Sequence, residues 1–115
     1  MTKAQVRFEG GRIVSLEVRG HAGYAESGED IVCSAISLLT ITCGNALESI
    51  LGVKPIEEMN ENKAMIHIAL PQGLDEQQEH DAQIIFRTVL QGMEDLQANY
   101  PKNFHLTKFD GRQIP

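Results

Sequence analysis

The stretch that decides the fold is AQVRFEGGRIVSLEV, residues 4–18, in which apolar and polar side chains alternate on both sides of a glycine pair. The alternation over Ala4–Glu9 and Arg12–Val18 predicts two half-buried β-strands. Gly10 and Gly11 tolerate the positive φ of a two-residue hairpin turn. The side chains expected to point inward are Val6, Phe8, Val14, Leu16 and Val18. The chain is therefore expected to open with a β-hairpin.

A long amphipathic helix is expected after this hairpin. Apolar side chains recur mostly at three- and four-residue steps over residues 32–50, and Gly52 stands where a C-cap glycine is expected. Two starting points fit the sequence. With Asp30 as the N-cap, Cys33 falls in the first turn, whereas with Ser27 as the N-cap it lies one turn deeper. The sequence leaves both starting points open.

The second half of the chain is expected to repeat a hairpin and a helix. Val53–Met59 and Lys63–Leu70 are predicted strands around a turn at 60–62, and Pro55 indicates an edge strand. After the break at 71–73, a second helix carries its apolar residues on one face. These residues are Ala82, Ile85, Phe86, Val89, Met93, Leu96 and Tyr100.

Both ends of this second helix have recognisable signals. Asp75 and Gln78 have the spacing of a capping box, and Pro101 is expected to stop the helix. Phe104–Phe109 is predicted as a closing strand. The element order is thus ββαββαβ, an α+β fold with two helices against a mostly antiparallel sheet. The 115 residues are expected to form a single domain, 1–115.

Composition and charge exclude several classes of protein. Ten Lys and Arg against sixteen Asp and Glu give a formal charge of -6 without a basic cluster, which disfavours a nucleic-acid surface. We see no signal-peptide pattern and no segment that approaches a membrane-spanning helix in apolar length. A cytoplasmic protein with no membrane partner is therefore expected.

The two cysteines, Cys33 and Cys43, are ten residues apart on the same predicted helix. A rise of about 1.5 Å per residue separates them by about 15 Å, too far for a disulfide. Both are expected to be free thiols. Cys43 lies on the apolar stripe and is expected to pack, because free cysteine commonly serves as a small buried apolar residue.

Cys33 has the surroundings expected of a nucleophile. A helix N-terminus and a nearby imidazole both favour the thiolate form of a cysteine. His21 stands at the end of the second strand, in a loop made pliable by Gly20, Gly23 and Gly28, so it can fold back toward the helix start. Amides at the helix start are the expected oxyanion donors. A loop over residues 22–29 is a candidate lid.

Two polar residues are expected to support this pair. Asp30 either orients the imidazole of His21 or caps the helix. Ser37 lies one turn beyond Cys33 and is placed to line the same pocket. Paired metal-ligand spacings such as CxxC and nucleotide-binding motifs do not occur, so neither metal nor cofactor is expected. The remaining histidines, expected to be solvated, are His67, His80 and His105.

The run GHAGYAESGEDIVCSAIS, residues 20–37, closely resembles the motif of the Prp family of ribosomal-processing cysteine proteases. The resemblance implies a cytoplasmic homodimer that removes the N-terminal extension of large-subunit ribosomal protein twenty-seven, with the precursor as its peptide substrate. It implies Cys33 and His21 as the catalytic dyad and Asp30 and Ser37 as supporting residues. The implied substrate-binding loop includes Gly20, Ala22, Gly23 and Gly28.

A reading from a different class is a non-enzymatic, dimeric, ribosome-associated binding module. In that alternative, Cys33 is a redox-sensitive or structural thiol. The protease and the binding module predict different reactivity for Cys33. An activated thiol reacts with iodoacetamide in the folded protein, whereas a packing thiol reacts only on unfolding.

Overall fold

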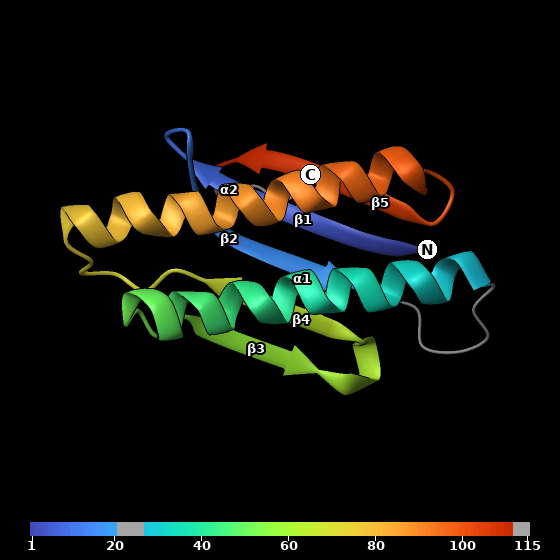
Figure 1. The fold of residues 1–115 in the computed structure, drawn as a ribbon, viewed down its shortest axis with the longest axis horizontal. Helices are drawn as coiled ribbons and strands as arrows, with labels where there is room; N and C mark the ends of the chain where they lie inside the picture. The colour runs from blue at the N-terminus through green and yellow to red at the C-terminus, as the bar shows by residue number, and fades with distance from the viewer. Residues whose placement is uncertain (21–26, 112–115) are drawn as a thin grey trace.

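The structure is a computed structural model that describes residues 1–20 and 27–111 (Figure 1). Its element order confirms the predicted ββαββαβ arrangement and the α+β class. The elements are β1 (Thr2–Glu9), β2 (Arg12–Arg19), α1 (Ser27–Leu51), β3 (Ile56–Asn60), the 3₁₀ helix η1 (Glu61–Lys63), β4 (Met65–Ala69), α2 (Glu76–Asn99) and β5 (Phe104–Asp110).

The five strands form one sheet in the order β3-β4-β2-β1-β5. The neighbours β3–β4, β4–β2 and β2–β1 are antiparallel, and β5 joins β1 in parallel, so the sheet is mostly antiparallel as predicted. Figure 1 shows α1 and α2 side by side on one face of the sheet, running in opposite directions. Among the described residues, no helix lies on the other face of the sheet, which we call the open face.

The first hairpin forms as predicted, except for one residue. Gly10 and Gly11 have φ values of 58° and 78°, the left-handed conformation that a tight hairpin turn requires. The pairing then shifts between Arg7 and Phe8, which face Ser15 and Ile13, so Val14 is left as the extra residue of a β-bulge. The bulge changes which side chains at the start of β2 point to the core. Ile13 enters the core cluster in place of Val14, although Val14 is also buried.

The first helix ends where expected, and the residues that follow explain why β3 is shorter than predicted. Gly52 has φ 67°, and its N–H bonds to the carbonyl of Glu48 at 3.0 Å. The Val53 N–H also turns back, to the Leu47 carbonyl at 3.0 Å, and Pro55 has no N–H to offer. The predicted strand Val53–Met59 therefore begins only at Ile56, and Pro55 lies directly before this edge strand.

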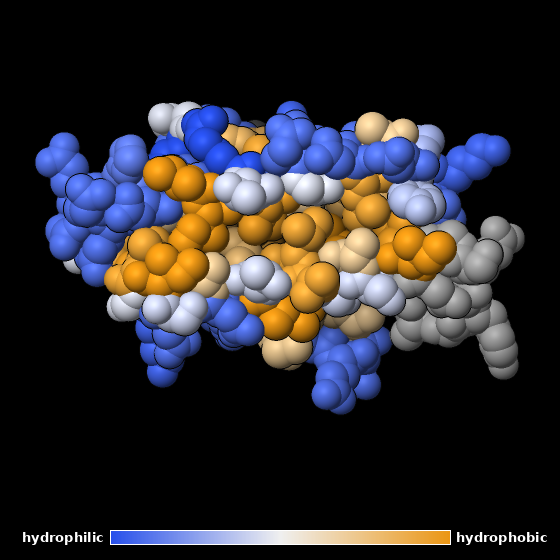
Figure 2. All heavy atoms as spheres, in the orientation of Figure 1, coloured by the Kyte–Doolittle hydropathy of each residue, from blue (hydrophilic) through white to orange (hydrophobic). Residues whose placement is uncertain are grey.

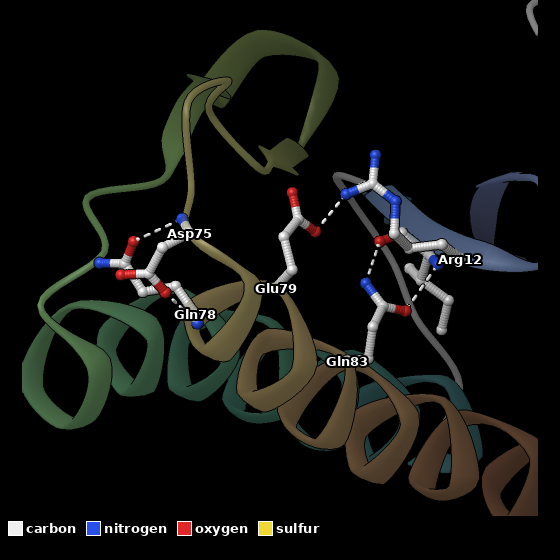
Figure 3. A network of polar contacts seen from close by, with 6 residues as sticks. Arg12, Asp75, Gln78, Glu79 and Gln83 are labelled. Atoms are coloured by element: carbon white, nitrogen blue, oxygen red, sulfur yellow. Dashed lines mark hydrogen bonds and ion pairs between the residues drawn. The ribbon is translucent and has the colours of Figure 1, made fainter.

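The helix α2 is tied to β2 by polar side chains (Figure 3). The predicted capping box is present, since Asp75 and Gln78 each bond the other's backbone N–H. Glu79 pairs with Arg12. Gln83 accepts a hydrogen bond from the Ile13 N–H and donates one to the Ile13 carbonyl, both at 2.7 Å. One amide side chain thus satisfies both backbone groups of the residue beside the bulge.

The core lies between the helices and the sheet. Its largest fully buried side chains include Phe86 and Met93 of α2, Leu47 of α1, Leu16 of β2 and Phe104 of β5. The buried positions of α2 agree with the predicted apolar face. At the contact between the helices, a Cβ placed on Gly92 would lie 3.0 Å from the Leu39 side chain, which shows how closely α1 and α2 approach.

The helix α1 is more apolar than a single core-facing stripe requires. By length and composition alone, the segment Ile31–Leu51 could cross a membrane. The expectation that no segment approaches the apolar length of a membrane-spanning helix is therefore wrong. The reason is that two faces of the helix are apolar. One packs into the core, whereas Leu38 and Ile50 on the other are 68% and 71% exposed. Figure 2 shows the resulting apolar band along the helix layer.

Candidate active site

The predicted nucleophile, Cys33, is the seventh residue of α1 and is half-buried. Its Sγ lies 3.1 Å from the hydroxyl oxygen of Thr2, at the start of β1. Cys33 and Cys43 are both free thiols, as predicted.

Two further segments close around the same sulfur. A Cβ placed on Gly20, just after β2, would lie 3.8 Å from the Cys33 Sγ and 3.8 Å from the Ala64 Cβ. The Gly20 N–H bonds to the Ala64 carbonyl at 3.0 Å, which holds the end of β2 against the residue that precedes β4. The thiol therefore lies where β1 begins, β2 ends and β4 begins.

A backbone feature marks this junction. Ala64 has φ 47°, the one positive φ among the described residues other than glycine. This left-handed conformation costs an L-residue about 1–2 kcal/mol. Ala64 adopts it between η1 and β4, where its carbonyl receives the Gly20 N–H.

The start of α1 corrects both predicted caps. The helix begins at Ser27, so Ser27 is its first residue and Asp30 its fourth, and neither is the N-cap, which precedes the first helical residue. Cys33 lies in the second turn, deeper than an Asp30 cap would place it. A helix leaves only its first four N–H groups free, so the amide of Cys33 is engaged in the helix. The expected oxyanion donors cannot include the amide of Cys33.

The structure describes only some of the residues predicted to form the substrate-binding loop. His21, Ala22 and Gly23 lie outside the described residues. Gly28 belongs to the first turn of α1 and not to a loop, so the predicted lid over residues 22–29 is wrong for its last three positions. The side chain of Asp30 also lies outside the described part, and the structure describes only its backbone place in the helix.

The structure also places the other two helix residues singled out from the sequence, Ser37 and Cys43. Ser37 is half-buried one turn after Cys33, and residues four apart share one side of a helix. Cys43 is fully buried in the core, and burial raises the pKa of its thiol to about 12. The packing role predicted for Cys43 is confirmed.

Thr2 is the site residue that sequence reasoning missed. The sequence does contain an indication of this role. Thr2, Ala4 and Val6 occupy alternate positions along the strand, and the side chains of Ala4 and Val6 point to the helix side of β1, so the Thr2 side chain points to the same side. Extending the predicted strand by two residues would have placed a hydroxyl in the core. The contact with Cys33 itself spans 31 positions and follows from no local pattern.

The open face carries a polar hollow of about 450 Å³, away from Cys33. Its lining includes Arg7, Glu17 and His67. The His67 side chain is 29% exposed, so it is solvated only in part: its Nδ1 is buried 3.4 Å from the Glu17 carboxylate without hydrogen-bond geometry. The exposure of His80 and His105 is confirmed. Among residues 1–20 and 27–111, no cluster of three potential metal ligands occurs.

Comparison with known proteins decides the family. Residues 1–105 match the family model described as cysteine protease Prp. The chain belongs to the Prp family. The resemblance noted from residues 20–37 is thereby confirmed, and the chain is a cysteine protease. The non-enzymatic alternative is set aside, because the family match covers nearly the whole chain.

Individual members of the Prp family agree with this assignment. The ribosomal processing cysteine protease Prp of Bacillus subtilis is 27% identical over 95 residues, which cover 83% of this chain and 85% of that protein. The crystal structure of SMU.848 from Streptococcus mutans superposes with a TM-score of 0.86 at 29% identity, covering 96% of each chain.

A third relative shares the fold. It is the essential ribosomal processing protease Prp of Staphylococcus aureus, solved in complex with a substrate peptide. The TM-score is 0.82 at 22% identity, with 94% of this chain and 99% of that chain covered.

Proposed function

We propose that this Prp-family protease removes the N-terminal extension of large-subunit ribosomal protein twenty-seven in the cytoplasm. The curated relatives are named ribosomal processing proteases, which supports a ribosomal precursor as the substrate class. The observation that carries the site assignment is the position of the Cys33 thiol beside Gly20, the residue that directly precedes His21 in the chain.

The proposed chemistry is acyl transfer to Cys33. His21 accepts the thiol proton, and the Cys33 sulfur forms a bond to the scissile carbonyl carbon. The C–N bond then breaks as His21 returns the proton to the leaving amine. Water attacks the thioester, which releases the carboxylate product and restores the thiol. In this scheme Asp30 and Ser37 support the pair from α1.

The test is incubation of the ribosomal precursor with the enzyme, followed by intact-mass analysis. Wild type should release the extension, and Cys33→Ala and His21→Ala should leave the precursor whole. Cys43→Ala is the matched control, because it removes the other thiol from the same helix without touching the site. Trimming by Cys33→Ala at the wild-type rate would show that the mechanism is wrong.

We also propose that the protease is a homodimer that pairs through the apolar band of its helix layer. Leu38, Ile50 and Ile84 are each more than half exposed on α1 and α2, and such patches typically mark interaction surfaces. Leu38→Glu should give a monomer in sedimentation velocity, whereas Gln5→Glu on the open face should not. A wild type that sediments as a monomer at micromolar concentrations would refute the dimer. Binding of the wild type to neutral lipid vesicles would indicate that the apolar band contacts a membrane instead.

A further inference from the structure

Thr2 is held rigidly at the start of β1. Its side chain is 0% exposed, and its N–H bonds to the Asn103 carbonyl at 3.0 Å, just before β5. The parallel register of β1 and β5 continues from the pair Thr2 and Phe104. The backbone of Thr2 therefore cannot move without breaking the pairing of two strands.

The hydroxyl of Thr2 is within hydrogen-bonding distance of the Cys33 sulfur, at 3.1 Å, and either atom can be the donor. A hydroxyl has one proton to donate and two lone pairs that accept. It can therefore accept from the neutral S–H group and, after rotation about its C–O bond, donate to the thiolate. No proton is gained or lost by Thr2 in this exchange.

We propose that Thr2 is a positioning residue for the nucleophile, which stabilises the thiolate of Cys33 and holds its sulfur at the junction of β1, β2 and β4. The proposal rests on the proposed function, in which Cys33 attacks the substrate. A hydrogen bond to the charged form of a group favours that form. The thiolate is the reactive species, so the Thr2 hydroxyl should increase the reactivity of Cys33.

The position is informative because valine would fill it equally well. Valine has nearly the shape of threonine and a high β-strand preference, so a purely structural role at a buried strand position needs no hydroxyl. A hydroxyl buried at 0% exposure also requires a partner, and the Cys33 sulfur provides one. Packing alone does not require a polar residue at this position, so the hydroxyl of Thr2 is explained by its interaction with the Cys33 sulfur.

The experiment measures the rate of iodoacetamide alkylation of Cys33 against pH, with peptide mapping to identify the thiol. Thr2→Val should alkylate about tenfold more slowly at neutral pH, since hydrogen bonds to charged groups are worth at least this factor. Its pH profile should move upward by about one unit, and kcat/KM for precursor cleavage should fall in parallel. Thr2→Ser keeps the hydroxyl and should restore both profiles.

Thr40→Val is the matched control. Thr40 is also 0% exposed, and its hydroxyl bonds to the Ile36 carbonyl at 2.7 Å on the same helix as Cys33. This variant loses a buried hydroxyl without touching the thiol, so it should change thermal stability and leave the alkylation profile in place. Thr2→Ala is a second hydroxyl-free variant, should Thr2→Val fail to fold.

The outcomes separate this proposal from the proposed function. An unshifted alkylation profile in folded Thr2→Val or Thr2→Ala, with Cys33→Ala inactive, would overturn the role of Thr2 and leave the mechanism standing. Precursor cleavage by Cys33→Ala would instead remove the mechanism, while the alkylation profile would still report whether Thr2 acts on the thiol.

Discussion

Replacing Gln83 with methionine should destabilise the fold by about 2 kcal/mol. The change removes two hydrogen bonds of 2.7 Å and leaves the N–H and carbonyl of Ile13 without their side-chain partner (Figure 3). A hydrogen bond contributes about 0.5–1.5 kcal/mol net, and an unsatisfied buried group costs about 1–3 kcal/mol. The lower part of this combined range applies, because the contacts are only partly buried.

The control for this change is Gln91→Met on the same helix. Gln91 is exposed and bonds to Asp95 at 2.9 Å across one turn. Such pairs contribute about 0.2–0.5 kcal/mol, and Met and Gln have similar helix propensities.

Urea and thermal unfolding measure the difference between the two variants. Gln83→Met should lower Tm by about 8 °C, at about 4 °C per kcal/mol for a domain of this size. If the unfolding free energies of Gln83→Met and Gln91→Met differed by less than about 0.5 kcal/mol, the hydrogen bonds between Gln83 and Ile13 would contribute no more than an ordinary surface contact.

Three other perturbations test the described structure. Ala64→Gly should raise the unfolding free energy, measured in urea, by up to about 1 kcal/mol, because glycine adopts positive φ without strain; a loss of stability would contradict this. Asp75→Ala should lower Tm through loss of the capping box, at a cost of about 1 kcal/mol, and an unchanged Tm would argue against the box. Burial raises the pKa of Cys43 from 9.0 to about 12, so its contribution to stability is complete below pH 9 and is lost as the pH rises through 12. Wild type should therefore lose unfolding free energy relative to Cys43→Val between pH 9 and pH 12, and parallel pH curves would refute this.

Local patterns in the sequence predict most of the secondary structure. The alternation in residues 4–18 predicts the first hairpin, and the capping box with Pro101 predicts both ends of α2. These features depend on neighbours in the chain, through turn conformation, capping and the periodicity of buried side chains.

The features that were missed depend on partners far along the chain. The bulge that exchanges Val14 for Ile13 arises from strand pairing and from the contact with Gln83, 70 positions away. The parallel pairing of β5 with β1 is likewise invisible to local periodicity. The candidate site follows the same division: Cys33 and His21 form a recognisable motif, whereas the contact with Thr2 exists only once the sheet is assembled.

The parallel pairing of β1 with β5 has a consequence for the order of folding. Thr2 is fixed by the carbonyl of Asn103, so the partner of the Cys33 thiol is held in place by a segment made about a hundred residues later. Contacts of such long range form slowly and late. During synthesis, a chain that has emerged through α2 already carries Cys33 but lacks the strand that anchors Thr2. The complete thiol environment is therefore a property of the finished polypeptide, and a nascent chain on the ribosome does not yet have it.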